Sequence, residues 1–98
     1  MRLFDVLSDD SRREILDLLL ERERSVNELV EWLGMSQPAV SKHLRVLREA
    51  GLVKVRIDAQ KRWYGLEAKP LAEVDAWLAP YRRYWADRLD DLERSLDA

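Results

Sequence analysis

Apolar residues recur every three to four positions through the first half of the chain, which places them on one face of a helix. The pattern predicts a short helix over residues 2–7 and a second helix over residues 10–22. The first is too short to be stable alone, so it must pack on the rest of the fold or on a second chain. The second is apolar around most of its circumference and is expected at the centre of the core.

Two further helices follow, joined by a short turn. Ser25 and Glu28 have the S-x-x-E spacing of a capping box, which predicts a third helix over about 26–33. Ser36 is a good N-cap for the next helix, and Gly51 supplies the left-handed residue that ends it. The link between the two helices is about three residues long, the length expected in a helix-turn-helix.

The helix after Ser36 has two chemically different faces. Val40, Leu44 and Leu47 form an apolar stripe for the core. The other face carries hydroxyl, ammonium and guanidinium groups, which contact base edges and phosphates. His43 lies at the boundary, and a packed residue without a readout role is an equally good interpretation of it. The DNA contacts predicted for this helix are Ser36, Gln37, Ser41, Lys42, His43 and Arg45.

After Gly51 the period changes to alternation. Apolar and charged residues alternate to about residue 58, and a second such segment covers 61–66, which predicts two strands. The tip lacks the Asn-Gly or Asp-Gly of a tight turn, so a loop of four residues or a looser one is expected. The hairpin is a candidate wing against the DNA backbone. Its predicted phosphate contacts are Arg56, Lys61 and Arg62.

The last third of the chain predicts one long helix over about 70–96, with a kink or break near Pro80. Its apolar residues follow steps of three and four, nearly a heptad seam. That surface is larger than a small core can cover, so part of it is assigned to a dimer interface. The alternative is that the helix folds back on its own domain. The predicted interface residues, including those of the first helix, are Leu3, Phe4, Leu7, Leu71, Val74, Leu78, Tyr81, Trp85, Leu89 and Leu92.

The net charge of −2 conceals an uneven distribution. Residues 36–62 hold seven basic and two acidic side chains, a net charge of +5, whereas the segments on either side are acidic. Screening limits the reach of a charge to roughly 10 Å at moderate salt, so a basic middle can bind phosphate although the whole chain is acidic. A solvated basic face without a partner is the alternative.

Other features of the sequence exclude several classes of protein. The 98 residues include no cysteine, which removes disulfides, thiolate metal sites and thiol nucleophiles. One histidine, no glycine-rich phosphate loop and no nucleophile elbow argue against an enzyme. No stretch is long and apolar enough to span a membrane, and no signal-like run follows Met1, so a cytoplasmic location is expected.

Several motifs together closely resemble the ArsR/SmtB family of bacterial repressors. The most specific is SQPAVSKHL at residues 36–44; it is accompanied by motifs within residues 7–19, by GLV at 51–53 and by RWY at 62–64. The resemblance implies a mainly α winged helix-turn-helix of order α-α-α-α-β-β-α with a small β-hairpin. It also implies a homodimer, held by the first and last helices, that represses transcription from an operator.

The sequence departs from the metal sensors of that family. Where the thiolate sensors have Cys-Val-Cys, this chain has Ser25, Val26 and Asn27, of which neither Ser25 nor Asn27 is a thiophilic ligand. The other common site uses aspartate and histidine pairs on the last helix, but His43 is the only histidine here. Because a zinc site needs three or four suitable ligands, no metal or other cofactor is expected. A small-molecule effector stays unknown.

We therefore interpret residues 1–98 as one domain, with a DNA-binding core over 8–66 and dimerisation helices over 1–7 and 70–96. The expected partners are double-stranded operator DNA with an inverted repeat and a second copy of the chain. The alternative is a protein-interaction module that reuses the winged helix and docks through its aromatic last helix. The basic residues of the middle segment favour DNA, because a protein-only module would not need them.

Overall fold

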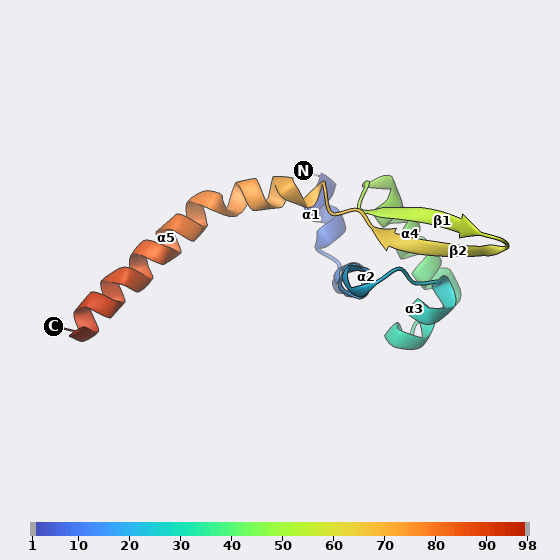
Figure 1. Cartoon of the computed structure of the whole chain (residues 1–98), viewed down its shortest axis with the longest axis horizontal. Coiled ribbons are helices and arrows are strands. Elements are labelled where there is room, and N and C mark those ends of the chain that lie inside the picture. Colours follow the sequence, from blue (N-terminus) through green and yellow to red (C-terminus); the bar gives the residue numbers. More distant parts are fainter. Residues whose placement is uncertain (1, 98) are drawn as a thin grey trace.

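The structure is a computed structural model that describes residues 2–97. Within these residues, five helices and one antiparallel hairpin follow the order predicted from the sequence, and the winged helix-turn-helix is confirmed (Figure 1). The elements are α1 (Arg2–Leu7), α2 (Asp10–Glu21), α3 (Val26–Leu33), α4 (Gln37–Glu49), β1 (Val53–Asp58), β2 (Lys61–Leu66) and α5 (Leu71–Asp97).

Side chains at the helix starts fix where α2, α3 and α4 begin. The Asp9 carboxylate accepts a hydrogen bond from the first turn of α2. Ser25 and Glu28 form the predicted capping box, in which each side chain accepts from the other residue's amide. Ser36 accepts from an amide in the first turn of α4. These bonds satisfy amides that have no partner inside the helix, so the local sequence sets the helix starts.

Left-handed glycines end α3 and α4. Gly34 has φ 65° and Gly51 has φ 77°, a conformation that residues with a Cβ rarely adopt. The link at 34–36 is the predicted turn of the helix-turn-helix, and it holds α4 against α3 and α2. The direction of α4 is therefore set by the two helices that precede it.

The core lies among the first four helices and the start of the hairpin. The predicted apolar stripe of α4 is confirmed, since Val40, Leu44 and Leu47 are all buried. Leu3 also belongs to this core and is only 8% exposed. Leu3 and Val6 form the face of α1 that packs onto its own domain, and the assignment of Leu3 to a dimer interface stays a prediction.

The hairpin is tighter than predicted. Asp58 pairs directly with Lys61, so the turn contains only two residues and the expectation of a looser loop was wrong. Ala59 makes this possible by adopting φ 56°, a conformation usually left to glycine or asparagine. Arg24 and Tyr64 exchange backbone hydrogen bonds of 3.0 and 2.8 Å, which attach the hairpin to the link between α2 and α3.

Helix α5 projects away from the rest of the molecule, and Figure 1 shows it bending along its length. It is one helix from Leu71 to Asp97 that contains Pro80, so the proline does not break it. Its first turns rest on the core through Leu71 and Val74, and Trp77 contacts α1. Beyond these turns α5 does not fold back on its own domain, and its apolar side chains are largely exposed.

Candidate nucleic-acid interface

The outer face of α4 carries most of the polar residues that the sequence assigned to DNA. Ser36, Gln37, Ser41, Lys42 and Arg45 are exposed, while the apolar stripe on the opposite side of the helix is buried. A hollow of about 360 Å³ runs along this face and is lined by Pro38, Ser41, Lys42 and Arg45. The core packing of α4 therefore presents these hydroxyl and basic groups together.

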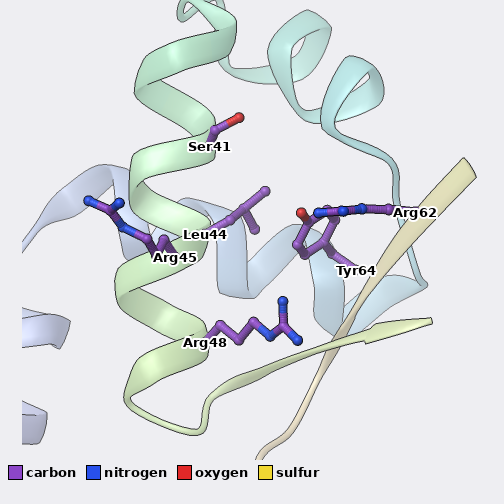
Figure 2. Close-up of a pocket in the computed structure, with 6 residues that line it drawn as sticks. All are labelled: Ser41, Leu44, Arg45, Arg48, Arg62 and Tyr64. Atoms are coloured by element: carbon purple, nitrogen blue, oxygen red, sulfur yellow. The ribbon is translucent and has the colours of Figure 1, made fainter. Parts of the chain in front are cut away.

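A second hollow, of about 300 Å³, lies between α4 and the hairpin. The residues that line it come both from the predicted helix and from the predicted wing. Figure 2 shows Arg48 reaching from α4 toward the hairpin, and Arg62 and Tyr64 reaching from β2 toward the helix. Arg45 points away from the hairpin in the same view. The residues that line this hollow are Ser41, Leu44, Arg45, Arg48, Arg62 and Tyr64.

Arg48 and Tyr64 were not among the site residues predicted from the sequence. Arg48 was counted only as part of the basic segment, although it lies three positions after Arg45 on the same helix. That spacing was the signal available, because positions i and i+3 share a helix face. Tyr64 had no comparable signal, since its place depends on how the hairpin packs beside α4.

A third hollow, of about 260 Å³, lies where the hairpin tip meets the starts of α3 and α4. It brings together Gln37, Lys61 and Arg62, which the sequence had placed on separate elements. The Lys61 ammonium lies 4.7 Å from the centre of the Trp63 ring, a cation–π contact that holds it on the hairpin. The hairpin tip and the start of α4 therefore form one continuous polar surface.

Arg56 differs from the other predicted wing residues. Its guanidinium donates hydrogen bonds of 3.2 and 3.1 Å to one carboxylate oxygen of Glu23, and a second carboxylate, Asp58, lies 3.8 Å away. The hydrogen bond to Glu23 raises the pKa of Arg56 above its ordinary value. Part of its charge is thus compensated within the protein, and these donors are directed toward the link between α2 and α3.

His43 is half-buried and connected to the helices behind α4. Its Nδ1 accepts a hydrogen bond of 3.4 Å from Arg12 Nε, and the same guanidinium donates to the Val6 carbonyl at 3.4 Å. Arg12 thereby joins α1, α2 and α4. This environment agrees with the interpretation of His43 as a packed helix residue, one of the two that the sequence left open.

The described part of the chain contains neither a cluster of metal ligands nor a membrane-spanning helix. Across residues 2–97, no three histidine, cysteine, aspartate or glutamate side chains gather in a way that could hold a metal ion. No helix within the same residues is both long and apolar enough to cross a membrane.

Comparisons with known proteins point to one family. Residues 9–55 match the family model for bacterial regulatory proteins of the arsR family. The chain is 45% identical over 74 residues to the transcriptional regulator KmtR of Mycobacterium tuberculosis, covering 76% of this chain and 57% of KmtR. It is 40% identical over 72 residues to the arsenical resistance operon repressor of Staphylococcus aureus, covering 74% of this chain and 69% of that protein.

A solved structure is also similar over the full length. It is described as a possible transcriptional regulator for arsenical resistance, and it superposes with a TM-score of 0.72 at 38% identity. The match covers 100% of this chain and 97% of the other, so α5 and the hairpin both have counterparts.

Proposed function

Since the chain belongs to the ArsR family of bacterial regulatory proteins, which are DNA-binding transcriptional regulators and not enzymes, we propose that it acts as a homodimeric repressor. Two copies bind an inverted-repeat operator in the cytoplasm, where bacterial DNA lies. Each places α4 in the major groove and the β1–β2 wing on the sugar–phosphate backbone. The proposal of repression draws support from the relative in Staphylococcus aureus, which is named a repressor.

The basic surface shared by α4 and the wing is the observation that carries this proposal. Within residues 2–97, none of Lys42, Arg45, Lys61 and Arg62 forms an ion pair with a carboxylate. Cations left without partners on one face are what a polyanion such as DNA would neutralise. We assign base readout to the start of α4, because the N-terminal residues of a recognition helix contact base edges. The proposed DNA contacts are Ser36, Gln37, Ser41, Lys42, His43, Arg45, Arg56, Lys61 and Arg62.

The apolar stripe of α5 supports the homodimer. Trp85 and Leu89 are 53% and 64% exposed, and the neighbouring apolar residues of the seam are also uncovered. Solvent-exposed apolar stripes of this length mark interaction surfaces, and a twofold axis would cover the same stripe on both copies. Residues 8–66 then bind DNA, while 1–7 and 70–96 dimerise. The proposed interface residues are Leu3, Phe4, Leu7, Leu71, Val74, Leu78, Tyr81, Trp85, Leu89 and Leu92.

The same proposal holds that release from DNA does not depend on a metal ion. The whole sequence has no cysteine, and its one imidazole, His43, already accepts a hydrogen bond from Arg12. Zinc, cadmium and arsenite are titrated against a preformed complex with DNA. Stoichiometric release by any of them contradicts this part of the proposal.

Selection of bound fragments from genomic or random DNA tests the function itself. The selected sequence should contain two half-sites whose centres lie one helical turn apart, or a multiple of it, about 34–36 Å per turn. A reporter gene behind the selected operator should then be expressed less when the protein is present. Retention of DNA with no preferred sequence, or binding of a protein partner through α5 without any DNA binding, would favour an interaction module instead.

A further inference from the structure

The hollow between α4 and the hairpin differs from the rest of the basic surface because two elements supply its cations. Arg48 comes from the last turn of α4, and Arg62 comes from the start of β2. Tyr64 adds a phenolic hydroxyl from the same strand, and the buried Leu44 closes the inner side. The cavity of about 300 Å³ is large enough for one phosphate group with part of its sugar.

We propose that Arg48, Arg62 and Tyr64 form a seat for a single phosphodiester group of the DNA backbone. The inference rests on the proposed binding of DNA by α4 and the wing, and it names the group that lies between them. Guanidinium forks match the oxygens of a phosphate, and a tyrosine hydroxyl can donate a further bond.

The charge balance of the hollow favours an anion as its occupant. Within residues 2–97, neither Arg48 nor Arg62 forms an ion pair, whereas Arg56 on the adjacent strand is bonded to Glu23. No aspartate or glutamate is among the described residues that line this hollow. Two guanidinium groups that face one space without a counter-ion repel each other, and an anion between them removes that repulsion.

The position of the hollow favours a backbone phosphate over a base. A helix in the major groove and a wing on its flank are separated by the sugar–phosphate strand that borders the groove. Arg48 lies at the C-terminal end of α4, away from the N-terminal residues that reach base edges. The seat therefore fixes how deep α4 enters the groove and carries no sequence preference.

Two arginines with opposite environments give a matched test. Arg48→Gln and Arg94→Gln each remove one exposed guanidinium, and binding of both variants to operator and unrelated DNA is measured against salt concentration. Arg48→Gln should lower the affinity for both DNAs by the same factor, roughly tenfold. It should also flatten the slope of log affinity against log salt concentration by about 0.9. Arg94→Gln should leave the slope almost unchanged, because Asp91 already pairs with Arg94 and this residue lies outside the proposed DNA contacts.

A neutral methylphosphonate placed at successive backbone positions of the operator locates the group. A methylphosphonate at one of these positions should weaken DNA binding by the parent protein. The same substitution should not weaken DNA binding by Arg48→Gln any further. Inorganic phosphate at matched ionic strength tests the other source of the same chemistry. A phosphate-specific loss of DNA binding in the parent that is absent in Arg48→Gln would assign the hollow to a free anion and overturn the inference.

Three other outcomes decide the remaining cases. Equal salt slopes for the parent and Arg48→Gln, with operator binding intact, would overturn the seat and leave the proposed function standing. A change in the preferred sequence would overturn it as well, since it would make Arg48 a base contact. A parent that binds no DNA would instead refute the proposed function. Unchanged melting temperatures establish that the variants are folded.

Discussion

Regularly spaced apolar residues are buried in the winged-helix body but exposed on the projecting part of α5. In the body, Ile15, Leu29 and Leu44 have at most 1% of their surface exposed. On α5, Trp85 and Leu89 are more than half exposed although their spacing is equally regular. Burying one such side chain contributes about 1.5–3 kcal/mol. Helical periodicity therefore indicates an apolar face that needs to be buried, but not whether the same chain or a partner buries it.

The largest expected effect comes from placing charge on the exposed stripe. Replacing Trp85 and Leu89 together by Glu should give a monomer or an unfolded chain, and should abolish operator binding although no proposed DNA contact has changed. Light scattering and DNA titration measure both effects. The control is Arg83→Glu, a charge change elsewhere on α5. The placement of the interface is wrong if the double variant still binds as a dimer, or if the parent is a folded monomer at micromolar concentration.

A matched pair of leucines makes the comparison quantitative. Leu29→Ala, in the body, should lower the free energy of unfolding by about 2–5 kcal/mol, because it leaves a cavity in a packed core. Leu89→Ala should instead raise the dissociation constant of the dimer. Denaturant unfolding and sedimentation at several protein concentrations separate the two effects. Equal consequences for unfolding and for dissociation in both variants would remove the distinction between the regions.

Local signals in the sequence predicted the body well. The Ser25–Glu28 capping box and the N-cap at Ser36 gave helix starts that the structure confirms, since each depends on residues a few positions apart. The buried stripe of α4 followed from spacing alone. Gly51 was correctly predicted as the residue that ends α4.

The features that the sequence did not predict depend on contacts between distant residues or on unusual backbone geometry. The ion pair of Glu23 and Arg56 joins residues 33 positions apart in the sequence, so no local pattern predicts it. Leu3 faces its own core because of how α1 packs on α2. Ala59 adopts a left-handed conformation without the glycine or asparagine that usually indicates one. The candidate residues lie on the helix and hairpin where the sequence placed them, but the hollow that they share was not predicted, and their roles in DNA binding stay predictions.

A smaller effect is expected from the serine that caps α3. Ser25→Ala should lower the free energy of unfolding by about 1 kcal/mol, because it leaves an amide of the first turn of α3 without its acceptor. Ser95 lies on the exposed part of α5, and Ser95→Ala should leave the stability unchanged. Thermal unfolding of the two variants compares the regions with the same chemical change. A loss of stability from Ser95→Ala that matches the loss from Ser25→Ala would contradict the contrast.

The smallest expected effect concerns acid. A hydrogen bond from Arg22 holds the pKa of Glu28 below its ordinary value of 4.5 in the folded protein. A carboxyl whose pKa is lowered by folding stabilises the protein above its unfolded pKa, and this contribution disappears as the pH falls through the lowered value.

Glu28→Gln should therefore be less stable than the parent at neutral pH, and the difference should vanish in acid below the folded pKa of Glu28. Because the group is near the surface, solvent screening keeps the difference small. Glu93→Gln on the exposed part of α5 is the control for the same chemical change, and it should leave the stability at neutral pH unchanged. Unfolding by denaturant at several pH values checks this, and a difference between Glu28→Gln and the parent that persists unchanged in strong acid would show that the stabilisation does not come from the ionised carboxylate.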